Sequence, residues 1–230
     1  MTANRAGDDR RARAPRRSRE ERSTEILRIA METFATRGYH NASLAEIADR
    51  VGLTQAGVLH YFSSKAGLLT GVLELRDNSG HDDLGGERPH GLDFLRHLVE
   101  TTRRNASREG IVRLYAVLSA ESVTDGHPAR DYFRDRYTGL RAMLTRALAE
   151  AEAAGELPAG ADHATVAAAV IAVMDGLQVQ WLLSPETVDM ASATEATITA
   201  LIGRELPPAP GGDGPGGAAG EAPGGAPGGA

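Results

Sequence analysis

The stretch Ser43–Lys65 constrains the fold of this chain more than any other feature, because its pattern is that of two short helices joined by a tight turn. The first half carries apolar residues at the spacing of one helical face: Leu44, Ile47, Ala48 and Val51. Ser43 and Glu46 have the spacing of a capping box, and Gly52 stands where glycine commonly follows a helix. These signals predict a first helix that ends at Gly52.

The second half predicts another helix, Gln55–Phe62, with Thr54 in the capping position. Val58 and Phe62 are four residues apart and form its inward edge. The outer side is left with small and hydrogen-bonding residues: Gln55, Ala56, Gly57, His60 and Tyr61. A second helix of this kind suits the major groove of DNA, so the stretch predicts a helix-turn-helix.

The region from Ile26 to Leu69 resembles the DNA-binding domain of TetR-family transcriptional repressors. The matching residues are the helix Ile26–Gly38, Tyr39, Ser43–Ala48, Val51–Thr54, Leu59–Phe62, Ser64, Lys65, Leu68 and Leu69. This chain departs from the family at two positions, with Leu59 in place of a tyrosine that contacts phosphate and Gly57 in place of a threonine. Tyr61 and His60 are the two substitutes available for the missing phosphate contact.

The resemblance implies a homodimer that sets one recognition helix from each protomer into the half-sites of a palindromic operator. We assign phosphate contacts to hydroxyl groups and to one ammonium group: Ser43, Thr54, Tyr61 and Lys65. Gln55 is the best candidate for a base contact, because its amide can pair bidentately with adenine. Ala56 and Gly57 permit close approach to the bases, and His60 can donate or accept a hydrogen bond.

The net charge of −6 is unusual for a DNA-binding protein until the chain is divided. Residues 1–65 carry 12 Arg and Lys against 8 Asp and Glu, a net charge of +4, whereas the remainder carries −10. This asymmetry indicates that only the front of the molecule meets DNA. The absence of cysteine excludes a disulfide framework, and no apolar run suggests a membrane span or a signal peptide, so we expect a cytoplasmic protein.

The expected architecture is all-α, with an N-terminal three-helix helix-turn-helix domain and a C-terminal helical bundle for ligand binding and dimerisation. Its segments are a disordered basic arm (1–22), the DNA-binding domain (23–76), a connector (77–90), the effector-binding and dimerisation domain (91–206) and a disordered Gly/Pro/Ala tail (207–230). The eight arginines of the arm fit either a solvated tail or an arm that lies on DNA.

The helix expected at 162–183 is apolar on more than one side, and a second helix is expected at 187–205. A helix of that kind must be buried on more than one side, and a second copy of the chain is the simplest cover. The residues Asp175–Gln178 and Trp181–Leu183 also resemble the penultimate helix of many TetR-type regulators. The resemblance implies that these two helices pair across a two-fold axis as a four-helix bundle.

The bundle is therefore expected to bind a small-molecule effector that releases the repressor from its operator. Five residues are candidates to line the pocket, although each also fits plain core: Phe94, Tyr115, Met143, Met174 and Gln178. No cofactor or enzymatic activity is expected, and His81-Asp82-Asp83 lacks the partners that a metal site needs. The alternative function is an all-helical dimeric protein-interaction module without specific DNA binding.

Overall fold

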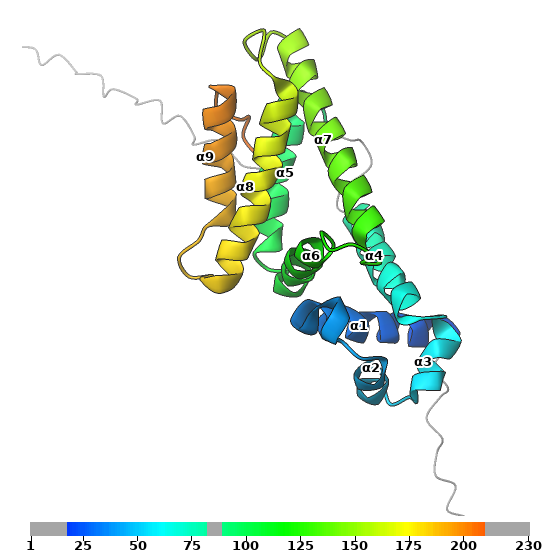
Figure 1. The fold of residues 1–230 in the computed structure, drawn as a ribbon. Coiled ribbons are helices and arrows are strands. Elements are labelled where there is room, and N and C mark those ends of the chain that lie inside the picture. Colours follow the sequence, from blue (N-terminus) through cyan, green and yellow to red (C-terminus); the bar gives the residue numbers. More distant parts are fainter. Residues whose placement is uncertain (1–17, 82–88, 210–230) are drawn as a thin grey trace, which may run out of the picture. The chain divides into compact units, whose positions relative to one another are not determined.

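A computed structural model of the chain describes residues 18–81 and 89–209, and every regular element in these ranges is an α-helix (Figure 1). The helices are α1 (Arg19–Asn41), α2 (Leu44–Arg50), α3 (Gln55–Tyr61), α4 (Lys65–His81), α5 (Gly91–Asn105), α6 (Glu109–Glu121), α7 (Arg130–Ala153), α8 (His163–Leu183) and α9 (Met190–Ile202). This confirms the all-α expectation for the described residues.

The described helices fall into two compact units whose boundaries differ from the expected domains. The first unit contains α1 to α4, α6 and the first residues of α7, up to Arg136. The second contains α5, the remainder of α7 from Tyr137, α8 and α9. By their contacts, residues 108–136 group with the helix-turn-helix, because α6 packs extensively on α1.

Helix α1 begins at Arg19, inside the segment expected to be a disordered arm. Ser18 caps it with a full capping box, since its hydroxyl oxygen accepts from the Glu21 N–H at 3.1 Å and its own N–H donates to the Glu21 carboxylate at 2.7 Å. The rest of the expected arm, the middle of the connector and most of the expected tail lie outside the described residues.

The core of the first unit is built from the helical faces that the sequence predicts. Its fully buried side chains include Ile26 and Phe34 on α1, Ile47 on α2, Val58 on α3 and Leu68 on α4. Both predicted caps of the helix-turn-helix are present: the Ser43 hydroxyl accepts from the Glu46 N–H at 3.0 Å, and the Thr54 hydroxyl accepts from the Gly57 N–H at 3.1 Å. The turn between α2 and α3 passes through Gly52 at a φ of +66°, as a glycine after a helix permits.

A carboxylate from α6 occupies the place of a missing side chain at the end of α1. Gly38 interrupts α1 with a φ of 71° and a ψ of 171°, a conformation that is essentially restricted to glycine. A Cβ atom at this position would lie only 2.0 Å from Glu121 Oε1. The other oxygen of Glu121 accepts from the Tyr39 N–H at 2.7 Å. Gly38 is therefore required both by the backbone and by the carboxylate that ties α6 to α1.

The second unit packs α5, α8 and α9 together with the later part of α7 (Figure 1). Its core includes Leu95 on α5, Leu144 on α7, Val170 on α8 and Ile198 on α9, each at most 1% exposed. Arg96, which is 7% exposed, donates to the Glu195 carboxylate at 2.6 Å. It also donates to the carbonyls of Leu206 and Pro207, which follow α9.

Helix α8 is both long and apolar. By length and composition alone it qualifies as a membrane-spanning helix, with a mean hydropathy of 1.7, which corrects the expectation that no run comes close. Only 17% of its most apolar window is buried within the chain. The uncovered apolar side chains on α8 and α9 include Val179, Leu183 and Leu201, at 47%, 80% and 40% exposure.

We predict that Gly38→Ala destabilises the chain by about 1–3 kcal/mol in urea denaturation, because alanine disfavours this backbone conformation. The Glu121 carboxylate must also move away from the Tyr39 N–H to make room for the methyl group. Gly52→Ala is the matched control, since its φ is also positive but no atom lies within 4 Å of the added Cβ.

Gly38→Ala should therefore lose more stability than Gly52→Ala. The loss at Gly38 should also shrink when Glu121 is already alanine, as expected for two groups in contact. Equal losses in both glycine variants, unaffected by the residue at 121, would contradict the described contact.

Candidate nucleic-acid interface

The outer face of α3 is exposed because its inner face is taken up by the core. Val58 is fully buried, whereas Gln55, Ala56 and His60 are exposed. Ser43 and Thr54 are exposed at the N-termini of α2 and α3. Their hydroxyl oxygens accept the capping hydrogen bonds, so each O–H remains a donor for an anion. The structure thus brings these predicted contact residues together on the helix-turn-helix.

Gly57 leaves the middle of α3 without a side chain. A Cβ atom there would meet Leu53 Cβ and Thr54 Oγ1 at 3.4 Å, which is ordinary van der Waals contact. The chain itself therefore does not require glycine at this position, and its effect is to leave a flat surface on α3. Leu59, which stands where the resemblance leads one to expect a tyrosine, is 37% exposed.

Arg19, which lies in the segment expected to be a disordered arm, is a further contact candidate on α1. Its guanidinium lies 5.8 Å from the centre of the Tyr61 ring, and the Tyr61 and His60 rings meet edge to face at 5.7 Å. The Ser18–Glu21 capping box is the sequence signal for this position, and it starts α1 four residues before the expected DNA-binding domain at 23. A cation is thereby added next to the end of α3.

Lys65, the only lysine of the chain, is held by the end of α1. Its Nζ donates to the His40 carbonyl at 3.2 Å and lies 4.5 Å from the centre of the Tyr39 ring. Burial lowers the pKa of Lys65, and the negative charge of Glu121 opposes this shift. Because an ammonium group has three N–H bonds, the described contact leaves donors for a DNA phosphate.

The net charge of +4 of residues 1–65 does not come from the described helices. Residues 18–65 carry six Arg and Lys and six Asp and Glu, so their net charge is zero. Several of these arginines pair with acids, as Arg50 does with Glu32 at 2.6 Å and Arg22 with Glu25 at 2.8 Å. The whole excess of +4 comes from residues 1–17, which contain six arginines and two aspartates.

The five candidate effector residues are divided between the two units. Phe94, Met143, Met174 and Gln178 are half-buried in the second unit, where Phe94 and Met174 pack against the core. Tyr115 belongs to the first unit, and its hydroxyl lies 3.2 Å from the carboxylate of Asp77 on α4.

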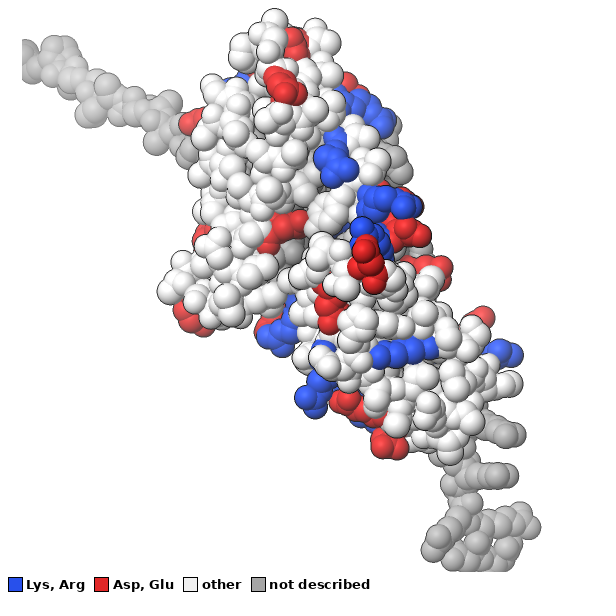
Figure 2. Space-filling model, in the orientation of Figure 1, with Lys and Arg blue, Asp and Glu red and all other residues white. Residues whose placement is uncertain are grey.

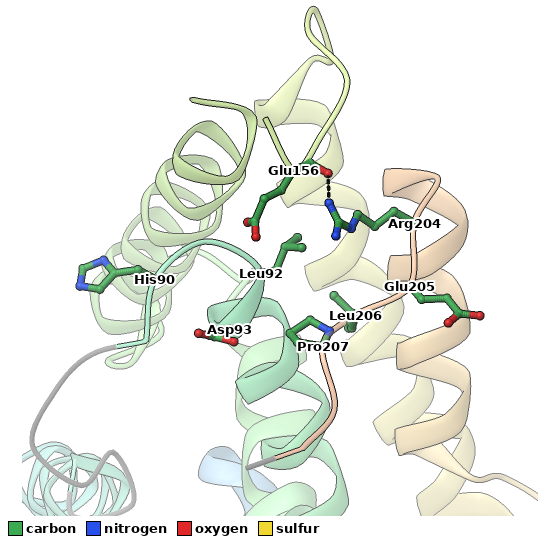
Figure 3. Close-up of a pocket in the computed structure, with 8 residues that line it drawn as sticks. All are labelled: His90, Leu92, Asp93, Glu156, Arg204, Glu205, Leu206 and Pro207. Atoms are coloured by element: carbon green, nitrogen blue, oxygen red, sulfur yellow. Dashed lines mark hydrogen bonds between the residues drawn. The ribbon is translucent and has the colours of Figure 1, made fainter. Parts of the chain in front are cut away.

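A pocket of about 290 Å³ lies at one end of the second unit (Figure 3). Its lining is His90, Leu92, Asp93, Glu156, Arg204, Glu205, Leu206 and Pro207, and it includes none of the five candidates. Arg204 crosses one side of the pocket and donates to the Glu156 carbonyl at 2.6 Å. Within the described residues, no group of three or more His, Cys, Asp or Glu is arranged to hold a metal ion.

Comparison with known families gives two matches that together span most of the described chain. Residues 26–72 match the family described as bacterial regulatory proteins, tetR family. Residues 93–207, half of the chain, match the family described as BetI-type transcriptional repressor, C-terminal.

Relatives and solved structures agree with these families. The chain is 28% identical over 198 residues to the HTH-type transcriptional regulator TtgR of Pseudomonas putida, covering 80% of this chain and 92% of TtgR. It is 43% identical over 77 residues to the HTH-type transcriptional activator FasR of Mycolicibacterium smegmatis, covering 32% and 35% of the two chains. The fold is similar to that of the regulator FadR from Bacillus subtilis in complex with stearoyl-CoA, with a TM-score of 0.64, 17% identity and coverage of 78% and 97%.

Proposed function

The chain belongs to the TetR family of transcriptional regulators, and on that premise we propose how it works as a ligand-responsive transcriptional repressor. Regulators of this family are soluble DNA-binding proteins that bind operators and effectors as dimers, and they are generally not enzymes. We propose that this chain is cytoplasmic and binds a palindromic operator as a homodimer. An effector in its helical bundle releases it.

The exposed face of α3 is the central part of the proposed DNA-binding surface. Gln55 contacts a base in the major groove, while Ala56 and Gly57 let α3 approach the base edges. Ser43, Thr54, Tyr61 and Lys65 contact phosphates, and His60 donates or accepts a hydrogen bond at the same surface. The observation that supports these roles is the full burial of Val58, which turns the other face of α3 outward.

Gln55→Ala should cost about 1–3 kcal/mol of binding at one base position and relax the preference there, because a bidentate amide contact is lost. Lys65→Met, which keeps an unbranched stem next to Tyr39, should instead weaken all sequences about equally and lower the salt slope by about one unit. Fluorescence anisotropy on an operator selected from random DNA, and on single-base variants of it, measures both effects. Unchanged base preference in Gln55→Ala would refute the assignment of Gln55.

The neutral charge of residues 18–65 favours the DNA-bound alternative for the basic arm. Salt-dependent attraction to DNA comes from cations that displace counterions at phosphates. Since residues 1–17 hold the whole positive excess of the front, we propose that their arginines supply this attraction. Removal of residues 2–17 should lower the salt slope by more than Lys65→Met does, and should leave the base preference unchanged.

The dimer contact proposed for α8 and α9 rests on an outer surface with few charged side chains (Figure 2). These two helices contain only two ionisable acidic residues and no Lys or Arg. Both acids are tied within the unit, since Asp175 accepts from the Tyr137 hydroxyl at 2.6 Å and Glu195 from Arg96 at 2.6 Å. Figure 2 shows the surface over α8 and α9 with few charged side chains. A second copy of the chain covers this surface in the proposed dimer.

Leu201→Asp or Val179→Asp should yield monomers in sedimentation velocity at micromolar concentration, because a charge in a dry interface is strongly unfavourable. Both side chains are exposed in the single chain, at 40% and 47%, so the folded protomer should survive the change. Val123→Asp is the matched control, since Val123 is 76% exposed on a loop of the first unit. A wild-type chain that sediments as a monomer would refute the proposed dimer.

Effector release follows from linkage between the two binding events. Operator affinity depends on the relative position of the two DNA-binding domains in the dimer. An effector therefore changes this affinity only if it binds one relative position more tightly than another. Coupling of this kind is reciprocal and typically about 1–3 kcal/mol, or about 5–150-fold in affinity. The proposed effector contacts in the second unit are Phe94, Met143, Met174 and Gln178.

A further inference from the structure

Five side chains of the first unit form a polar cluster where α4, α6 and the start of α7 meet. The members are Arg76 and Asp77 on α4, Tyr115 on α6, and Tyr132 and Arg136 on α7. The carboxylate of Asp77 is at the centre of this cluster, which we term the Asp77 cradle. All five residues lie within one compact unit.

The cradle directs two phenols and two guanidinium groups at one carboxylate. The Tyr132 hydroxyl donates to Asp77, at 2.9 Å from one oxygen and 3.0 Å from the other. The Tyr115 hydroxyl lies 2.6 Å from that of Tyr132 and 3.2 Å from Asp77. Arg76 and Arg136 are 3.6 and 3.9 Å from the same carboxylate.

The two guanidinium groups are positioned by a shared aromatic ring. Arg76 lies 4.6 Å and Arg136 lies 4.7 Å from the centre of the Tyr115 ring, within the range of cation–π contact. Tyr115 and Tyr132 also contact the buried Phe133 edge to face, at 5.7 and 5.1 Å. The donors are therefore held in place by packing as well as by Asp77 itself.

Both phenols are fixed as hydrogen-bond donors. Burial raises the pKa of Tyr132 and that of Tyr115, and the charge of Asp77 adds to both shifts, although Arg136 opposes them. Each hydroxyl thus stays protonated at neutral pH and carries one hydrogen toward an acceptor. An arrangement of protonated phenols and guanidinium groups is complementary to an oxyanion.

From this geometry we propose that the cradle is the subsite for the oxyanion of an acidic effector, and that Asp77 occupies it when the effector is absent. Tyr115, Tyr132 and Arg136 come from α6 and α7, whereas Asp77 comes from α4. A carboxylate or phosphate of the effector accepts the same hydrogen bonds and takes the place of Asp77. Asp77 is 35% exposed, so its side chain can turn to water when it leaves.

The exchange has a consequence for DNA binding. Asp77 is a polar link from α4 to α6 and α7, and α4 begins at Lys65, the proposed phosphate contact. An oxyanion in the cradle breaks this link and lets the far end of α4 move. This inference rests on the proposed function, and it adds the chemical class of the effector and the group with which it competes.

The test is calorimetric titration of the full chain with benzoate and with inorganic phosphate, against the uncharged isostere benzamide. Asp77→Asn should bind benzoate or phosphate about tenfold more tightly than the wild type, because an internal competitor that lowers the apparent affinity is weakened. Tyr132→Phe and Arg136→Gln should bind about tenfold more weakly, since the first loses a hydrogen bond to the anion and the second loses a positive charge next to it. Glu74→Gln, an exposed acid one turn earlier on α4, is the matched control and should bind as the wild type does.

Opposite signs for Asp77→Asn and Tyr132→Phe separate competition from a structural role, because a purely structural cluster gives no tighter binding in any variant. Asp77→Asn should also weaken operator binding without any effector, as the broken link predicts. If Asp77→Asn does not fold, the wild type must still prefer benzoate or phosphate to benzamide, and Tyr132→Phe must remove that preference.

Benzamide bound as well as both anions, or no tighter anion binding in a folded Asp77→Asn variant, overturns the proposal. Binding of phosphate and not benzoate would identify the effector group as a phosphate, and the reverse would identify a carboxylate. Specific operator binding by the wild type in the same preparation tests the proposed function independently, so the two failures are distinguishable.

Discussion

The contact between Glu121 and the end of α1 determines how the DNA-binding helices are held. The carboxylate of Glu121 fills the space of a side chain at residue 38 and accepts the Tyr39 N–H at 2.7 Å. Because Tyr39 and the neighbouring His40 carbonyl in turn position Lys65, α6 is connected to the candidate phosphate contact through two consecutive residues. The helix-turn-helix is therefore part of a larger unit and not an independent head.

Helix α4 is held by polar contacts near both of its ends. Lys65 donates to the end of α1, and Asp77 accepts from Tyr132 at the start of α7. DNA phosphate binds at the first end of α4, and the effector displaces Asp77 near the second end. Operator and effector therefore compete through the same helix. A coupling of this kind requires that each ligand prefers a different position of α4.

Local features of the fold were predictable from the sequence, whereas the contacts that join distant helices were not. The Ser43 and Thr54 caps involve residues three positions apart, so spacing alone indicates them. The bonds of Glu121 to Tyr39 and of Tyr132 to Asp77 join residues 82 and 55 positions apart, and no periodicity reports such pairs. The sequence likewise predicts Tyr115 as an effector contact but gives no sign of its contact with Asp77, which lies 38 positions away. The sequence predicts a positive N-terminal region, and the start of α1 divides it into the positive residues 1–17 and the neutral residues 18–65.

Backbone amide exchange of the chain, with and without selected operator DNA, tests whether α2 and α3 bind the operator and whether Lys65 transmits this binding to the Glu121 contact. We predict slower exchange at the N-termini of α2 and α3, between Ser43 and Lys65, where amides and hydroxyls face the phosphates. The Tyr39 amide should also exchange more slowly, because DNA that engages Lys65 stabilises the α1 end to which Glu121 is bound. Protection confined to α8 and α9, with residues 43–65 and the Tyr39 amide unchanged, would contradict the account.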